Sequence, residues 1–103
     1  MNRPVIFRPA ARQDLINARN WYEERRAGLG DRFASSVERT LETIAKSPEL
    51  FPVVHHDVRR ALVRPFPYGV FYRIRSDAIH VLAVMHGRRD PAIWRSRIDV
   101  VKD

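Results

Sequence analysis

Apolar residues in the first half of the chain recur at helical spacing. Ala11, Leu15, Ala18 and Tyr22 follow one another at intervals of four, three and four residues, which places them on one face of a helix. Pro9 suits the first turn of such a helix because that position needs no backbone N–H. The pattern therefore predicts an amphipathic helix that begins near Pro9 and buries one apolar stripe.

A second helix is predicted after a break that is rich in glycine. Gly28 and Gly30 interrupt the first pattern, and glycine readily takes the left-handed conformation that closes a helix. A new helical pattern then runs over residues 31–46, with a stripe made of Phe33, Val37, Leu41 and Ile44. Two helices joined by so short a turn form an antiparallel hairpin, whose apolar faces need another layer to cover them.

The second half of the chain carries strand patterns. Residues 70–75 alternate between the two faces, which predicts a strand with one wet face, and residues 79–85 are almost wholly apolar, which predicts a strand covered on both faces. The short connection between them makes the pair a hairpin. Edge strands are predicted at residues 5–7 and 58–64, and in the second of them lone arginines such as Arg59 and Arg60 would hinder unwanted strand pairing.

Helices that run together and strands that run together indicate an α+β fold. We expect one domain over residues 1–103, with an N-terminal strand and with the helical hairpin on one face of a small, mainly antiparallel sheet. A short helical turn at residues 91–95 is expected to return Trp94 to the sheet edge, and residues 49–57 are expected to form a loop. The opposite sheet face is expected to be open, concave and lined with arginine.

The charge of the chain narrows the choice of partner. Its 103 residues carry a net charge of +7, and 17 of the 19 basic residues are arginine. The guanidinium group is a planar fork of donors that fits phosphate and carboxylate, so we expect a nucleic acid or an acidic protein segment as partner. With no cysteine and no apolar run near the ~20 residues that span a bilayer, we expect a cytoplasmic protein without disulfides or a membrane segment.

Cationic side chains are the candidate functional groups. Those expected to share the open face and its rim are Arg64, Arg73, Arg75, Arg88, Arg89, His80 and His86. Strand register, which the sequence leaves open, decides whether they meet. Such a face suits the binding of a phosphate backbone. It also suits RNA cleavage, with His86 as the base, because histidine titrates near neutral pH. A structural role for His86 is the alternative.

Other chemistries lack their sequence motifs. No serine lies in a G-x-S-x-G setting and no glycine-rich phosphate loop is present, so no cofactor is expected. The adjacent His55 and His56 are expected to point different ways on an extended segment. Because no H-x-x-x-H pattern occurs either, we expect no metal site.

Taken together, several segments resemble the RelE/ParE superfamily of type II toxin–antitoxin toxins, and above all its ParE, or plasmid-stabilisation, branch. The matching segments span nearly the whole chain in order: Trp21-Tyr22-Glu23, Gly28-Leu29-Gly30 with Phe33, residues 47–52, 64–68, 70–73, 81–86 and 88–91, and Trp94. The resemblance implies the same α+β fold. It also implies an antitoxin encoded beside the toxin, with an acidic, amphipathic C-terminal segment that binds the toxin in a hetero-oligomer.

The resemblance leaves the target of the toxin open, because the branches differ. RelE-like members cleave mRNA on the ribosome with basic residues and a C-terminal tyrosine, whereas ParE-like members inhibit DNA gyrase. Here Trp94 takes the place of that tyrosine, and arginines take the place of the lysines on the second strand. Neither indole nor a protonated guanidinium accepts a proton at neutral pH. We therefore expect a ParE-like toxin that acts on gyrase.

Two alternatives stay open. One is a ribosome-dependent mRNA endonuclease, with Arg64, Arg73, His86 and Arg89 as its catalytic candidates. The other is a weakly toxic relative that mainly binds its antitoxin. In every case the residues expected to contact the antitoxin or the target are Arg59, Arg60, Arg64, Arg73, Arg75, Arg88, Arg89 and Trp94.

Overall fold

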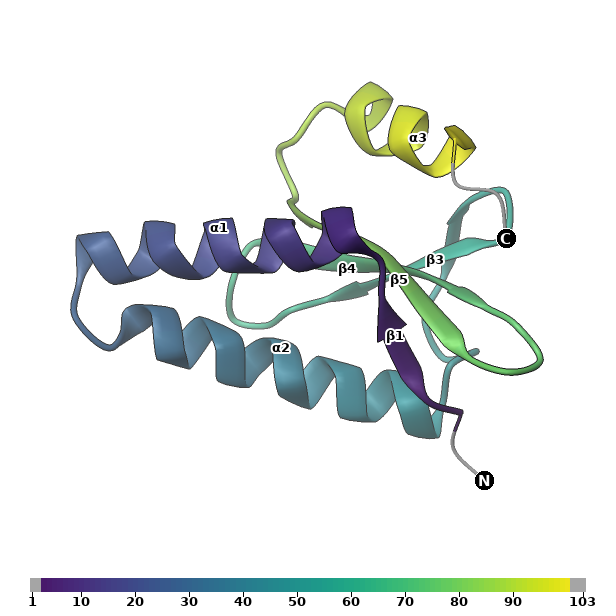
Figure 1. Ribbon diagram of the computed structural model, residues 1–103, viewed down its shortest axis with the longest axis horizontal. Helices are drawn as coiled ribbons and strands as arrows, with labels where there is room; N and C mark the ends of the chain where they lie inside the picture. Colours follow the sequence, from purple (N-terminus) through teal and green to yellow (C-terminus); the bar gives the residue numbers. More distant parts are fainter. Residues whose placement is uncertain (1–2, 101–103) are drawn as a thin grey trace.

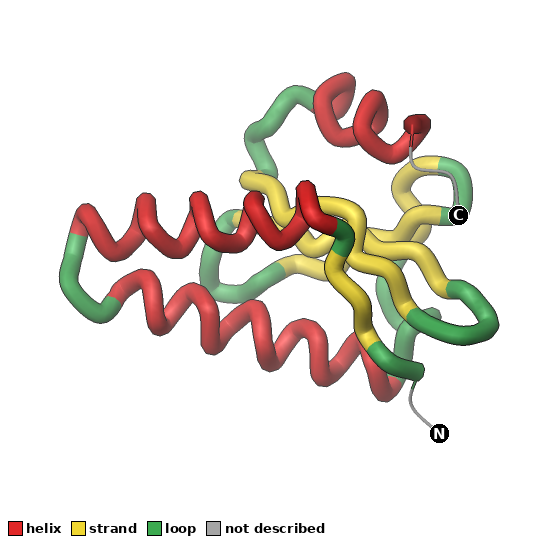
Figure 2. The backbone as a smooth tube through the Cα atoms, viewed as in Figure 1, coloured by secondary structure: helices red, strands yellow, loops and turns green. Residues whose placement is uncertain are grey.

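The computed structural model describes residues 3–100 as a five-stranded sheet between two helical layers (Figures 1 and 2). The strand order is β1-β5-β4-β3-β2, with β1 parallel to β5 and the other neighbours antiparallel. The elements are β1 (Val5–Phe7), α1 (Pro9–Arg25), α2 (Leu29–Lys46), β2 (Val53–His55), β3 (Val58–Leu62), β4 (Tyr68–Ile74), β5 (Ile79–His86) and α3 (Pro91–Val100). The predicted α+β class is confirmed.

The hairpin of α1 and α2 packs its predicted stripes on one face of the sheet. Phe33, Val37 and Ile44 are buried against β3, β4 and β5, as are Ala11, Ala18 and Tyr22 of α1. Gly28 has a φ of 87°, so a glycine is needed where the chain turns between the helices. The Glu23 carboxylate accepts hydrogen bonds from the backbone N–H groups of Gly28 and Gly30, both at 2.9 Å, which closes this turn.

Four aromatic rings join the hairpin to the loop between β3 and β4. Tyr22 and Phe33 of the helices contact Phe66 and Tyr68, with ring centroids 4.9 to 6.0 Å apart and mostly edge-to-face. Aromatic pairs prefer this geometry because the positive ring edge meets the negative ring face. The cluster therefore fixes the β3–β4 loop beside α2.

A bulge between β4 and β5 changes which side chains share a sheet face. The register shifts at Phe71 and Tyr72, so that Arg73 opposes His80 whereas Tyr68 opposes His86. Directly opposed residues point to the same face. Tyr68 packs on the hairpin side and Phe71 on the α3 side, and the shift leaves His80 and His86 on opposite faces. The expectation that these two histidines share a face is wrong.

Two elements differ from the sequence prediction. Residues 53–55, expected in a loop, form β2, which pairs irregularly with β3 through Val53 opposite Arg59 and His55 opposite Val58. The predicted turn at residues 91–95 is the start of α3, a helix of 10 residues that reaches Val100. Within residues 3–100, no helix combines the length and the apolar character needed to cross a bilayer.

Candidate functional site

The sheet face that the sequence predicts to be open is covered by α3. Trp94 is 6% exposed and its ring lies 4.8 Å from that of Phe71, while Ile98 is 1% exposed. Together they form a second core with the remaining buried residues of this face, Val58, Leu82, Ala83 and Met85. The prediction of an open, arginine-lined face is therefore wrong, and Trp94 lies on the sheet face rather than at its edge.

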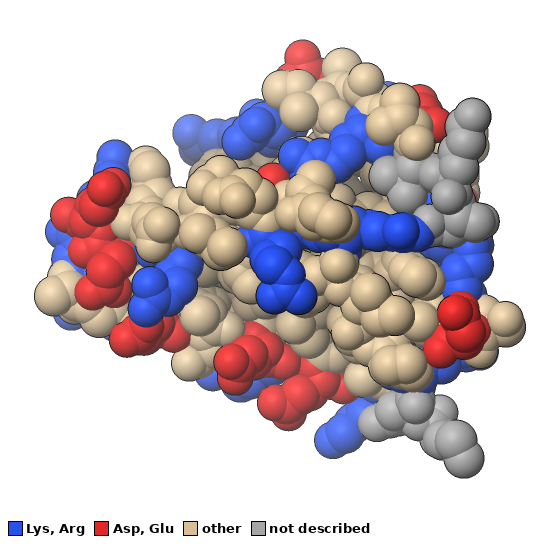
Figure 3. Space-filling view, viewed as in Figure 1, with Lys and Arg blue, Asp and Glu red and all other residues tan. Residues whose placement is uncertain are grey.

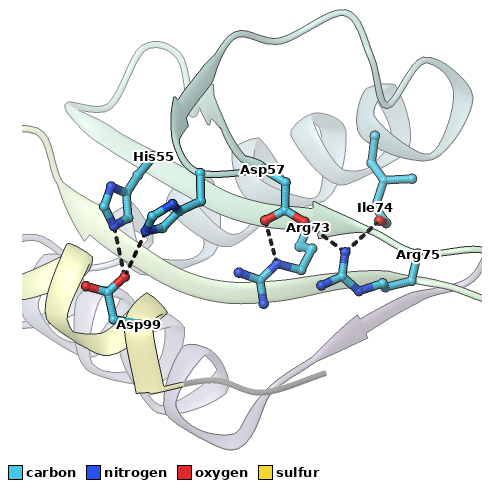
Figure 4. Close-up of polar contacts among 7 residues, drawn as sticks. His55, Asp57, Arg73, Ile74, Arg75 and Asp99 are labelled. Atoms are coloured by element: carbon cyan, nitrogen blue, oxygen red, sulfur yellow. Dashed lines mark hydrogen bonds and ion pairs between the residues drawn. The ribbon is translucent and has the colours of Figure 1, made fainter.

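Arg73 and Arg75 are held by one carboxylate beside α3 (Figure 4). Arg73 Nε lies 2.9 Å from Asp57 Oδ1, and Arg75 Nη1 lies 2.8 Å from Asp57 Oδ2. Partial burial alone would raise the pKa of Asp57, but the hydrogen bonds from Arg75 and Arg73 outweigh it and lower the pKa. The Arg73 side chain is 9% exposed, so in this conformation its charge is neutralised inside the protein.

Arg59 also has an internal role. Its guanidinium donates hydrogen bonds to the backbone carbonyls of Phe51, at 2.7 Å, and Glu49, at 3.2 Å. These bonds hold the segment before β2 against β3. Carbonyl groups in irregular segments need such partners when they are withdrawn from water. The predicted role of Arg59 in binding a partner therefore competes with a structural one.

Arg89 lines a cleft, the α1 cleft, between α1 and the ends of β4 and β5, and His86 contacts Tyr68 in its wall. The cleft has a volume of about 200 Å³ and is lined by Asp14, Asn17, Ala18, Trp21, Tyr68, Val84 and Arg89. The His86 ring lies edge-on to Tyr68, with the centroids 5.3 Å apart, and its Nδ1 accepts a hydrogen bond from the backbone N–H of Arg88. Burial raises the pKa of Tyr68, and the positive charge of Arg89 partly offsets this.

A longer hollow, the α2 groove, begins beside α2 and the β3–β4 loop and ends over β3, beyond the last α2 residue that lines it. It consists of three adjoining hollows of about 260, 170 and 380 Å³. The first and second share Ser36 and Arg39, and the second and third share Phe51, Leu62 and Arg64, so the groove is continuous. Its remaining lining residues are Asp31, Arg32, Ser35, Thr40, Thr43, Pro52, Arg60, Pro65 and Phe66.

The α2 groove has cationic walls and an apolar floor. Leu62 is 46% exposed, and Phe51 and Phe66 lie partly buried beneath. Among residues 3–100, Arg60 and Arg64 form no ion pair, so both charges are available to a ligand. The groove's single acidic residue, Asp31, is paired with Arg19. The arrangement suits an amphipathic segment that carries carboxylates.

Gly69 allows Arg60 to take its place along this groove. A Cβ atom at position 69 would lie 2.9 Å from Cγ of Arg60, closer than such atoms approach in proteins. The Arg60 stem therefore lies across the backbone of β4, and the apolar part of the side chain is covered while the guanidinium lines the groove.

The predicted site residues consequently fall into separate places. Arg89 lines the α1 cleft and His86 lies beside it against Tyr68, Arg60 and Arg64 lie in the α2 groove, and Arg73 and Arg75 share Asp57. Arg88 is exposed in the turn after β5. Sequence reasoning missed Arg32 and Arg39 as groove residues, because nothing in a helical pattern shows which loop will pack beside it.

Comparisons with known proteins agree with this fold. The family described as ParE toxin of type II toxin–antitoxin system, parDE, matches residues 5–91. Toxin ParE2 from Mycobacterium tuberculosis, in strains CDC 1551 / Oshkosh and ATCC 25618 / H37Rv, is 30% identical over 92 residues, which cover 88% of each chain. A solved structure described as the chromosomal ParDE TA system from P. aeruginosa superposes with a TM-score of 0.62 at 14% identity, covering 82% of this chain and 95% of that one.

At 14% identity the solved structure supports only the fold, whereas the family match identifies the family. The family match spans the hairpin, every strand and the turn before α3. The chain therefore belongs to the ParE toxins of type II toxin–antitoxin systems.

Proposed function

We propose that this ParE-family toxin inhibits growth in the cytoplasm by binding DNA gyrase and does not cleave RNA. The observation that carries the proposal is that Arg64 and Arg73 lie apart from each other and from the other two catalytic candidates, His86 and Arg89. Arg64 lies in the α2 groove, Arg73 is held by Asp57, and His86 is at the α1 cleft. A cleavage reaction needs its base and its phosphate-binding groups within reach of one phosphate. The resemblance to ParE in turn implies gyrase as the target.

The α1 cleft is the observation that favours the second candidate, an mRNA endonuclease. Tyr68 and Arg89 line it, and His86 packs against Tyr68, where the inner strands β4 and β5 begin and end. The Tyr68 hydroxyl is protonated at neutral pH and can donate a hydrogen bond to a phosphate oxygen, although burial raises its pKa and makes it a weaker acid. Under this alternative His86 is left as the base and Arg89 as the phosphate ligand.

The α2 groove supports a further part of the proposal, neutralisation by a cognate antitoxin. An acidic, amphipathic segment would place apolar side chains on Phe51 and Leu62 and its carboxylates beside Arg60 and Arg64. Bidentate contacts between guanidinium and carboxylate are among the stronger polar contacts in proteins. The resulting assembly is a toxin–antitoxin hetero-oligomer.

Expression of the full chain without an antitoxin separates these functions. We expect growth arrest with DNA breaks and filamentous cells, intact transcripts, and loss of supercoiling activity when the purified protein is added to purified gyrase. A gene with an early stop codon serves as the control for effects of the transcript itself. Unimpaired gyrase together with transcripts cut during translation would establish the nuclease alternative, and normal growth would leave antitoxin binding as the main activity.

A further inference from the structure

Two histidines and a carboxylate meet where the end of α3 passes the turn between β2 and β3 (Figure 4). His55 Nε2 lies 2.9 Å from Asp99 Oδ1, and His56 Nε2 lies 3.4 Å from the same oxygen. One possible ligand atom from each of the three residues lies within 4.8 Å of the others. The cluster lies apart from the α1 cleft and the α2 groove and shares no lining residue with either.

The backbone at His56 is what brings the two imidazoles together. On a regular strand adjacent side chains point to opposite faces, which is why the sequence argues against a metal site here. His56 instead has a φ of 53°, a conformation that few residues other than glycine adopt, and the two ring centroids lie only 4.1 Å apart. The expectation that these rings point apart is therefore wrong. Residues held in sparsely populated conformations are concentrated at functional sites.

We propose that His55, His56 and Asp99 bind a divalent first-row transition-metal ion of the zinc type. Two imidazole nitrogens and a carboxylate oxygen suit zinc, cobalt or nickel, whereas magnesium and calcium prefer sites made of oxygen alone. In a tetrahedral zinc site neighbouring ligand atoms are about 3.3 Å apart. The contacts of His55 and His56 with Asp99, 2.9 and 3.4 Å, are already near that separation, and the fourth position is left to water or an external ligand.

Small side-chain movements are enough to complete the site. The side chains of His56 and Asp99 are 66% and 52% exposed, so both are free to turn, while His55 is 20% exposed and is held beside Trp94. The ligands come from the β2–β3 turn and from the last turn of α3, which are 43 residues apart in the chain. A bound ion would therefore fasten α3 to the sheet that it covers.

The test is zinc binding by the tag-free, full-length chain, measured by calorimetry, with cobalt absorption as an independent signal. We expect one ion per chain, no comparable binding of magnesium, and a rise in Tm because the ion binds the folded state. In NMR spectra the ring resonances of His55 and His56 should shift, and those of His80 and His86 should not.

Matched variants make the proposal falsifiable. His56→Asn removes one ligand but tolerates the left-handed backbone, and Asp99→Asn keeps the shape of the carboxylate. Each should weaken zinc binding at least about tenfold, whereas His86→Ala should leave it unchanged. Absence of zinc binding, or equal binding by His56→Asn or Asp99→Asn and the unaltered chain, would overturn the proposal. Its outcome does not depend on gyrase inhibition, because no step of the toxin's proposed action uses these residues.

Discussion

Burial changes the acid–base behaviour of Tyr72, the largest side chain that is fully enclosed in the core. The residue is 0% exposed, and its hydroxyl donates a 2.6 Å hydrogen bond to the backbone carbonyl of Pro48. Loss of hydration disfavours the phenolate and raises the pKa of Tyr72 to about 12. In the unfolded chain a tyrosine ionises near pH 10, so between about pH 10 and 12 only the unfolded state loses the proton readily.

The stability of the protein should therefore fall as the pH rises through this range. Tyr72 contributes about 2–3 kcal/mol to the free energy of unfolding. This contribution is fully present below about pH 10 and disappears towards pH 12. Urea unfolding at a series of alkaline pH values measures this slope. At pH 8, Tyr72→Phe should lower the free energy of unfolding by about 0.5–1.5 kcal/mol, because the variant lacks the hydrogen bond to Pro48. Its stability should also decline less steeply at alkaline pH. An unchanged slope in this variant would assign the decline to Tyr22 and Tyr68, whose pKa values burial also raises.

At the scale of elements, the spacing of apolar residues predicts helices and strands that carry a regular pattern, but not those whose conformation depends on distant contacts. The stripes of α1 and α2 are long enough to give both helices and their buried faces. β2 has three residues after a proline and pairs irregularly, so it leaves no periodic signal. The bulge at Leu82, opposite Phe71 and Tyr72, inverts the faces of the β5 residues beyond it, and a sequence pattern carries no sign of that inversion.

Single residues of the candidate site were predictable, but their grouping was not, because the grouping depends on contacts between distant parts of the chain. Arg60 and Arg64 stand out as cations without an obvious internal partner, and both line the α2 groove. Arg73 looks alike in sequence, yet Asp57 holds it from a turn 16 residues away. The groove forms because α2 packs beside the β3–β4 loop, which is distant in the sequence. Contacts of Tyr22 and Phe33 with Phe66 hold that loop in place.

One ion pair links three elements that are far apart in the chain. Asp14 of α1 accepts hydrogen bonds from both terminal nitrogens of Arg97 in α3, at 2.5 and 3.2 Å, and from the backbone N–H of Val84 in β5, at 2.9 Å. The Asp14 side chain is 16% exposed and that of Arg97 26% exposed. Partial burial and bidentate geometry make such a pair stronger than one at the open surface.

Asp14→Asn should accordingly destabilise the protein by about 1–3 kcal/mol and lower Tm by at least about 4 °C. Thermal unfolding followed by circular dichroism measures the change. Glu42→Gln removes the same charge from the exposed side of α2, where Glu42 forms no ion pair within residues 3–100, and should have little effect. Equal losses in both variants would mean that net charge, and not the link between the helices and β5, is responsible.

Over the whole molecule, positive and negative charge are separated between the two sides of α2. Figure 3 shows acidic residues over the tip of the helical hairpin and along the outward side of α2. On the groove side of the same helix Arg32 and Arg39 line the first hollow, Arg39 and Arg64 line the second, and Arg60 and Arg64 line the third. With a net charge of +7, the chain should attract acidic partners in general, and we expect this separation to direct them towards the α2 groove.

Charge reversal in the α2 groove tests this direction. Arg60→Glu with Arg64→Glu should weaken binding of the cognate antitoxin at least about tenfold near 0.1 M salt, because carboxylates of the partner would then face carboxylates. The two affinities should converge as salt rises towards about 1 M, where the screening length falls to about 3 Å. Arg26→Glu with Arg95→Glu makes the same change in net charge on other exposed surfaces and should cost no more than about twofold near 0.1 M salt. Calorimetry over a salt series, on variants shown to fold by circular dichroism, measures both effects. If the two double variants lose affinity equally, the antitoxin responds to the overall charge of the toxin and its binding surface lies outside the α2 groove.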